Sequence, residues 1–369
     1  MTTINWWRVD LPLATAEASY NAILSRKLSM GSITAQLEEE LSDLLNVKHV
    51  ICTNNGSSAI LLAMLAMDLS PEDEVIIPNR TWVASAHAAG LLGCKIKFVD
   101  VCRERPVMSI KAFANALTNK TRLVLPAQIC GCAVEMEEIW RLQAKYGFNV
   151  IEDSAQALFG RYQDNFIGTQ SDVGSFSFAV SKLLTSGQGG FAATNRSDLA
   201  KKMRSLRTHG VDDVNNASPF TALGQNSRYP DVLAAMILAQ LPSLNEKIDK
   251  INRVYEKYKN EIEISDSIEL LPINIEAGEI PLYVEILCDD RATLIKFLQS
   301  HDVETRQIYP NLETAKYLGA SGSFPNSDRF QSRGLVLPCG PDQTESDLSK
   351  VIGLVNSFFS QRKKHIAFQ

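Results

Sequence analysis

Residues 174–190 read GSFSFAVSKLLTSGQGG, and the features that identify the fold surround this stretch. Its first part, Gly174–Phe178, is a short and continuous apolar run, as expected of a strand that is buried on both faces. Lys182 follows this strand and precedes a glycine-rich loop, and no acidic residue lies within nine positions on either side. A lysine that is desolvated there is a candidate amine nucleophile for a carbonyl group. The alternative is a surface lysine whose stem alone is buried.

Apolar runs of the same kind occur on both sides of this stretch. The further strand candidates are His49–Thr53, Glu74–Pro78, Lys95–Val99, Arg122–Pro126, Phe148–Glu152 and Gly190–Thr194. Helical patterns lie between them, at Ser57–Met67, Thr81–Leu92 and Met136–Tyr146. This alternation predicts an α/β fold with a mainly parallel seven-stranded sheet flanked by helices.

The pattern changes in the last third of the chain. A long, charged amphipathic helix over about 244–262 is predicted to connect a large domain, residues 1–244, to a smaller C-terminal α/β domain, residues 245–369. The elements predicted for the smaller domain are strands at Ile280–Leu287 and Gly334–Pro338 and helices at Ala292–Gln299 and Glu345–Gln361.

The composition excludes several functional classes. Of the 369 residues, 45% are hydrophobic and 21% are charged, and 37 Lys and Arg against 42 Asp and Glu give a net charge of −5. A mildly acidic chain with little basic clustering is not expected to bind nucleic acid. No apolar stretch is long enough for a transmembrane helix, and residues 1–10 have no signal-peptide pattern.

The cysteines indicate a reducing compartment. The seven are scattered, several within apolar runs, which is typical of buried thiols in a cytoplasmic protein. The close pair Cys130 and Cys132 has no second pair or nearby histidine, so we expect no metal site.

Polar residues follow the strand ends, where open α/β sheets bind ligands. Gly56, Ser57 and Ser58 would open a buried helix and offer free N–H groups to a phosphate, although an ordinary helix cap needs one serine. Trp82 would wall a flat ligand or lie in the core, and Asp153 would meet a ring nitrogen or cap a turn. With Lys182, these are the parts that pyridoxal 5′-phosphate (PLP) requires.

At these residues the sequence resembles the DegT family of fold-type I PLP enzymes, the sugar aminotransferases that act on nucleotide-linked keto-sugars. The resemblance runs from about residue 31 to residue 341. The segments that carry it are 55–59 (NGSSA), 71–78 (PEDEVIIP), 81–84 (TWVA), 151–157 (IEDSAQA), 175–178 (SFSF), Lys182 before 187–190 (GQGG), 207–210 (RTHG), 226–228 (NSR) and 309–310 (YP).

The resemblance implies a role for each matching residue. Lys182 would hold PLP as an internal aldimine and shuttle the proton, and Asp153 would pair with the pyridine nitrogen. Gln156 would lie near the ring hydroxyl, and Trp82 would stack on the ring. The residues implied to hold the cofactor phosphate are Gly56, Ser57, Ser58 and Ser177.

The remaining roles concern the partner subunit and the substrate. Asn226 would reach the phosphate of the neighbouring subunit's cofactor, so the resemblance implies an obligate homodimer with shared active sites. Arg228 would meet an anionic part of the substrate, and Tyr309 would line the sugar pocket.

The chain departs from the family pattern at three places near the expected substrate site. Gln128 stands where the family often has histidine, Asn311-Leu312-Glu313 follows Tyr309-Pro310 where Leu-His is common, and Asn79-Arg80 replaces a small or apolar pair. These departures leave the identity of the substrate open.

The favoured function is ping-pong transamination from an amino acid, with glutamate expected, to the keto group of a nucleotide-linked deoxysugar. A keto-cyclitol is the alternative acceptor. The related sugar dehydratases carry histidine where Lys182 stands, and non-catalytic relatives usually lose the lysine or the carboxylate, so the residues present argue against both.

Overall fold

The computed structural model describes residues 3–211, 219–220, 222–319 and 321–366, and for 362–366 it describes the backbone. The elements in the first half are α1 (Leu13–Leu24), α2 (Ser32–Leu45), β1 (His49–Thr53), α3 (Gly56–Ala66), β2 (Glu74–Pro78), α4 (Ala84–Leu91), β3 (Lys95–Val99), α5 (Ile110–Ala116), β4 (Thr121–Val124), η1 (Ile129–Gly131), α6 (Met136–Tyr146), β5 (Asn149–Asp153), β6 (Arg161–Tyr162), β7 (Asn165–Phe166) and β8 (Val173–Ser177). Those in the second half are β9 (Gly190–Thr194), α7 (Ser197–Leu206), α8 (Asp231–Leu238), η2 (Leu241–Ser243), α9 (Leu244–Glu261), β10 (Ile268–Leu270), β11 (Glu285–Cys288), α10 (Arg291–Gln299), η3 (Leu312–Thr314), η4 (Lys316–Leu318), α11 (Pro325–Arg333), β12 (Gly334–Val336) and α12 (Glu345–Ile366).

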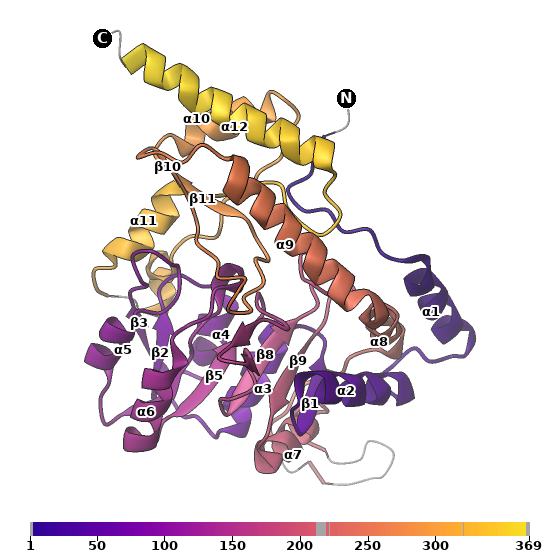
Figure 1. Cartoon of the computed structure of the whole chain (residues 1–369). Helices are drawn as coiled ribbons and strands as arrows, with labels where there is room; N and C mark the ends of the chain where they lie inside the picture. Colours follow the sequence, from indigo (N-terminus) through magenta and orange to yellow (C-terminus); the bar gives the residue numbers. More distant parts are fainter. Residues whose placement is uncertain (1–2, 212–218, 221, 320, 367–369) are drawn as a thin grey trace.

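The central sheet has seven strands, the number that the apolar runs predict, and the structure places them in the order β1-β9-β8-β5-β4-β2-β3. The pairs β2–β3, β2–β4, β4–β5 and β5–β8 are parallel, whereas β9 is antiparallel to both of its neighbours. The carboxyl ends of β1, β2, β5 and β8 therefore meet at one edge, where a ligand is expected. Helices lie on both sides of the sheet (Figure 1).

Helix α3 is buried because its side chains are apolar on nearly every side, with Ile60, Leu62 and Met64 at most 2% exposed. Asn55 caps the helix, since its side-chain oxygen accepts a hydrogen bond from the Ser58 N–H. The helix predicted at Thr81–Leu92 begins at Ala84 instead. Residues 81–83 form a turn that is closed by the Ser85 N–H donating to the Trp82 carbonyl.

The second sheet, β10-β11-β12, is antiparallel and lies within residues 245–369. Helix α9 extends from α8, near the central sheet, towards this second sheet and α12 (Figure 1). The strand predicted at Ile280–Leu287 starts only at Glu285, because Pro281 has no N–H for a ladder and the Ile280 carbonyl packs onto Gly131. The predicted boundary at residue 244 stays a prediction, since one apolar cluster holds side chains from both sides of it.

The N-terminal segment pairs with segments that flank α10 and β12. Ile4 forms a bridge with Val303, and Trp7 forms one with Cys339. Within the part of the chain that the structure describes, no helix has the length and apolar character needed to cross a membrane.

Candidate active site

A cavity of about 560 Å³ opens at the carboxyl ends of β1, β2, β5 and β8. This volume is typical of small-molecule sites. Segments around β11 and β12 complete its wall, through Tyr283, Val336 and residues 306–310. The predicted site residues that line the cavity are Gly56, Ser57, Trp82, Asp153, Gln156, Ser177, Lys182 and Tyr309.

Lys182 lies in the turn after β8, and its side chain is half-buried rather than fully desolvated. Its backbone N–H donates to the Ala179 carbonyl over 3.1 Å, which holds the turn. Its Nζ lies 3.3 Å from the Tyr283 hydroxyl, which in turn donates to the Ser181 carbonyl over 3.0 Å. Tyr283 thus positions the lysine from the opposite wall of the cavity.

Asp153 ends β5 and is 8% exposed, with its carboxylate in the cavity. One oxygen accepts from the Ser85 hydroxyl over 2.6 Å, and the other accepts from the Ala155 N–H over 3.2 Å. Burial raises the pKa of this carboxyl, while these two hydrogen bonds and the charge of Lys182 oppose that rise. A buried carboxyl whose own hydrogen bonds leave it facing the cavity is suited to pair with a cationic ring nitrogen.

Glu152 points to the other face of the sheet, as strand alternation predicts. Its carboxylate accepts hydrogen bonds from the Gln128 amide, the Gly168 N–H and the Ser171 hydroxyl, at 3.0, 3.1 and 2.7 Å. Burial raises the pKa of Glu152 as well. The two neighbouring carboxyls therefore have separate sets of donors and separate tasks.

The N-terminus of α3 presents backbone donors to the cavity. The Ser58 N–H is already used, because it donates to the Asn55 side chain over 2.8 Å, and Ser58 does not line the cavity. The N–H groups of Gly56 and Ser57 have no acceptor among the described residues. Two free N–H groups at a helix N-terminus form a site for an anion such as a phosphate.

Glycines allow this arrangement. A Cβ at Gly190 would lie 2.5 Å from the Gly56 nitrogen and 2.5 Å from the Phe176 carbonyl oxygen. Strand β9 therefore passes directly behind the anion site, and the site has room only because residue 190 has no side chain.

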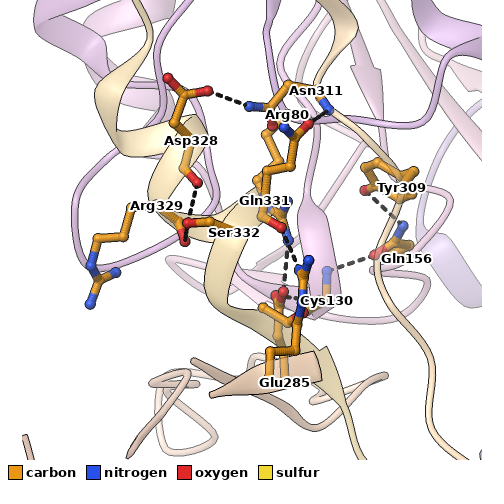
Figure 2. Close-up of polar contacts among 12 residues, drawn as sticks. Arg80, Cys130, Gln156, Glu285, Tyr309, Asn311, Asp328, Arg329, Gln331 and Ser332 are labelled. Atoms are coloured by element: carbon orange, nitrogen blue, oxygen red, sulfur yellow. Dashed lines mark hydrogen bonds and ion pairs between the residues drawn. The ribbon is translucent and has the colours of Figure 1, made fainter. Parts of the chain in front are cut away.

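Trp82, Tyr309 and Gln156 form one side of the cavity. The Trp82 and Tyr309 rings meet edge to face with centroids 5.6 Å apart. The Gln156 amide nitrogen lies 3.5 Å from the Tyr309 hydroxyl, and its oxygen accepts from the Cys130 N–H over 2.7 Å (Figure 2). Because a backbone N–H can only donate, Cys130 fixes the amide so that its NH₂ group faces the cavity.

Behind this wall lies a buried ion pair. Arg80 donates to Glu285 over 2.7 Å, and neither side chain is exposed to solvent (Figure 2). The other Glu285 oxygen lies 3.8 Å from the Cys130 sulfur. The turn after β2, the Gln156 support and strand β11 are thus connected by polar contacts.

The three departures from the family pattern have structural partners. The Asn79 side-chain oxygen accepts from the Glu313 N–H over 2.9 Å, so two of the departing segments contact each other. Asn79, Arg80 and Asn311 are buried and do not line the cavity. Gln128 lines it, but its amide is engaged by Glu152 and by the Val134 N–H.

Asn226 and Arg228 lie outside the cavity of their own chain. Asn226 is exposed, and its side-chain oxygen accepts from the Arg228 Nε over 3.0 Å. Their predicted roles in a neighbouring subunit and at the substrate stay predictions. In the adjoining loop, residues 212–218 and 221 lie outside the described residues.

Four residues of the site were missed from the sequence: Trp6, Ser85, Tyr283 and Arg306. Ser85 lies on the first turn of α4, one turn after Trp82, and this spacing was a usable signal. No pattern in the sequence indicates that Tyr283 and Trp6 line the cavity, because their position depends on contacts between segments that are distant along the chain. Among the described residues, no group of three or more His, Cys, Asp and Glu side chains is suited to a metal ion.

The model of the DegT/DnrJ/EryC1/StrS aminotransferase family matches residues 14–356. The chain belongs to this family. It is therefore an aminotransferase with a fold-type I architecture, and it depends on PLP.

Named relatives cover most of this aminotransferase. It is 30% identical to the GDP-perosamine synthase of Caulobacter vibrioides, over 89% of this chain and 90% of that protein. It is 35% identical to the UDP-N-acetyl-3-dehydro-alpha-D-glucosamine 3-aminotransferase of Acidithiobacillus ferrooxidans, over 88% of each chain. The crystal structure of S. venezuelae DesV aligns with a TM-score of 0.91 at 26% identity, over 97% of this chain and 99% of that chain.

The residues of the aminotransferase cavity fit PLP. The free N–H groups of Gly56 and Ser57 would take its phosphate, and Asp153 would take its ring nitrogen. The buried hydroxyls of Thr81 and Ser175 line the same cavity and have no hydrogen-bond partner among the described residues. Such unpaired groups are expected where a polar ligand supplies the missing partners.

Proposed function

We propose that this aminotransferase transfers an amino group from an amino acid, with glutamate as the donor, to the keto group of a nucleotide-linked deoxysugar. The observation that carries the proposal is the meeting of Lys182, Asp153 and the α3 N-terminus in one cavity. The names of the Caulobacter and Acidithiobacillus relatives support a nucleotide-sugar acceptor.

The side chains divide the work between binding and proton transfer. PLP, when bound, withdraws electrons from the carbon that carries the amino group. Asp153 would hold its ring nitrogen through a charge-assisted hydrogen bond, and Gln156 would donate to its ring hydroxyl from the NH₂ group that the Cys130 N–H orients. Lys182 moves the proton at Nζ, and Tyr283 keeps that Nζ at the cavity wall.

The working unit in this proposal is a homodimer with shared active sites. Its support is the position of Asn226, exposed and outside the cavity of its own chain, and the exposed apolar side chains of α1. Leu13, Tyr20 and Leu24 are 74%, 61% and 64% exposed. Apolar side chains that gather on one helix mark a surface that another protein covers.

Subunit mixing tests the shared site. Lys182→Ala and Asn226→Asp chains are each expected to be inactive as homodimers. After unfolding and refolding together in equal amounts, half of the dimers carry one intact site, so about a quarter of the wild-type activity returns. If the refolded dimers stay inactive, Asn226 does not serve the neighbouring site.

A cytoplasmic location is part of the proposal. The seven cysteines are all free thiols, and six of them are buried. Burial raises the pKa of Cys132 to about 12, which makes this thiol unreactive. Unpaired cysteines are typical of reducing compartments.

The absorption spectrum of the PLP-loaded protein tests the proposed reaction. Glutamate should remove the visible band of bound PLP as the cofactor accepts the amino group, and one member of a panel of nucleotide keto-sugars should restore it. If a keto-cyclitol restores the visible band and no nucleotide keto-sugar does, the amino acceptor is a keto-cyclitol. A visible band that no amino acid removes would refute transamination.

A further inference from the structure

Arg306 is a cation at the cavity that neither the fold nor the cofactor requires. Among the described residues that line the cavity, the cations are Lys182 and Arg306, and the acid is Asp153. Lys182 and Asp153 both have tasks towards the cofactor in the proposed function. Arg306 is then the charged group that remains for a substrate.

The backbone of Arg306 is held firmly, whereas its guanidinium is open to ligands. Its N–H donates to the Val336 carbonyl over 3.0 Å, and its carbonyl accepts from the Val336 N–H over 2.8 Å. Its side chain forms no ion pair or side-chain hydrogen bond with any described residue, and it is exposed. The nearby carboxylate of Glu304 accepts from the Trp6 N–H over 3.1 Å.

Trp6 orients this guanidinium. The Arg306 guanidinium carbon lies 5.4 Å from the centroid of the Trp6 ring, at cation–π distance. The Trp6 backbone is fixed by two contacts: its N–H to Glu304, and its carbonyl, which accepts from the Cys339 N–H over 2.8 Å. A guanidinium stacked on a ring keeps its N–H edge free, so that it can bind two oxygen atoms of one anionic group at the same time.

A continuous wall connects this guanidinium to the reacting lysine. The Trp6 and Tyr283 rings lie 5.9 Å apart, and the Tyr283 hydroxyl lies 3.3 Å from the Lys182 Nζ. An anionic group bound by Arg306 is therefore held by the same wall that positions Lys182.

We propose that Arg306, stacked on Trp6, binds the oxyanion of the substrate. The inference rests on the proposed function, in which both substrates are anionic and occupy the cavity in turn. The shared chemistry is a pair of oxygen atoms that carry negative charge. They belong to the diphosphate of the nucleotide sugar or to a carboxylate of the amino donor, and the guanidinium matches either one.

The test compares Arg306→Gln and Arg306→Lys with a matched control, Arg253→Gln. Arg253 is an exposed arginine of α9 that does not line the cavity. KM is measured separately in the glutamate half-reaction and in the keto-sugar half-reaction. Calorimetry with GDP, UDP and dTDP measures binding without turnover, and the visible band confirms that each variant holds PLP.

Loss of one charge-assisted pair should raise KM about 10- to 100-fold in Arg306→Gln, with kcat changed much less. Arg306→Lys should recover part of this loss, because it keeps the charge but not the two-point contact. Arg253→Gln should behave like the wild type. An effect confined to the keto-sugar and the nucleoside diphosphates assigns Arg306 to the diphosphate, and an effect confined to glutamate assigns it to the carboxylate.

Unchanged KM values and unchanged nucleoside diphosphate binding in Arg306→Gln would overturn the inference and leave the proposed function intact. If the wild type reacts with neither substrate class, the proposed function fails, and with it the assignment of Arg306. The two failures are distinct because the first appears in a variant and the second in the wild type.

Discussion

The guanidinium of Arg80 donates to the carboxylate of Glu285 over 2.7 Å, and both side chains are completely buried. Arg80 follows β2 and leads directly into Thr81 and Trp82, which line the cavity, while Glu285 begins β11. Burial raises the pKa of the Glu285 carboxyl, and the charge of Arg80 opposes that rise. The pair therefore fastens one wall of the active site to the second sheet at a substantial cost in desolvation.

Glu285→Gln should destabilise the protein strongly, since it leaves the Arg80 charge buried without a partner. Breaking a buried pair in this way costs about 3–5 kcal/mol. Urea unfolding of the PLP-free protein, followed by tryptophan fluorescence, measures the loss. Glu138→Gln is the matched control, because Glu138 pairs with Arg141 at the surface, and it should cause no measurable change.

The double variant Arg80→Met, Glu285→Leu should recover much of that stability. Replacing both charges with apolar side chains removes the unpaired charge, and such replacements of buried pairs are often neutral or stabilising. If the double variant is no more stable than Glu285→Gln, the loss arises from packing rather than from the isolated charge.

Lys182→Ala should lower transamination by at least about 10²- to 10⁴-fold, which is the usual contribution of a general acid–base group. PLP should still bind, because the variant keeps Asp153 and the N–H groups of Gly56 and Ser57, which we propose hold its ring nitrogen and its phosphate. Borohydride reduction and peptide mass spectrometry should find the cofactor mass on Lys182 in the wild type and on no peptide of the variant. Activity close to the wild-type level would exclude Lys182 as the proton-transfer residue.

Asp153→Asn should change how stability depends on pH in the PLP-free protein. Burial raises the folded-state pKa of Asp153, so the folded state binds the proton more tightly than the unfolded state does. The stability of the wild type relative to the variant should therefore be highest at about pH 4 and below, and it should fall as the pH rises through the raised pKa. Thermal midpoints from pH 4 to pH 8 test the sign, and a relative stability that rises with pH would contradict it.

Gly190→Ala should weaken PLP binding by more than about tenfold and destabilise the protein by about 1–3 kcal/mol, as overpacking does. Its Cβ would lie 2.5 Å from the Gly56 nitrogen, which is one of the two free donors of the anion site. Titration of PLP into the PLP-free protein measures the affinity. Gly353→Ala, on α12 with nothing within 4 Å of the new Cβ, should leave the affinity unchanged and raise stability slightly. Equal affinities for the two variants would refute the close approach.

The central sheet was predictable because its strands are buried on both faces and stand out as apolar runs. β1, β2, β3 and β9 have their predicted bounds, and the other three strands differ by at most two residues at an end. Helix α1 escaped prediction because its apolar side chains, such as Leu13 and Leu24, are exposed and do not mark a core face.

In the site, residues next to strand ends were predictable and residues brought there by other segments were not. Asp153 is the last residue of one strand and Lys182 follows another, and the sheet sets the direction of both strands, so their meeting could be expected. Tyr283 and Arg306 come from irregular segments near the second sheet, whose path depends on packing such as that of Ile280 on Gly131. The sequence marks Arg80 as a departure from the family pattern, but its partner, Glu285, lies 205 residues away along the chain and is known only from the structure.

The adjacent carboxylates of β5 have a consequence for folding. Glu152 and Asp153 face opposite sides of the sheet. The Ser171 hydroxyl donates to the longer Glu152 side chain, and the Ser85 hydroxyl donates to the shorter Asp153 side chain. A shift of β5 by one residue would exchange the two faces, leaving Ser85 and Ser171 each opposite a side chain of the wrong kind. Such a misthreaded chain would still contain a sheet, but it could not hold the cofactor correctly. The visible band of bound PLP is therefore also expected to report how many molecules have aligned this strand correctly.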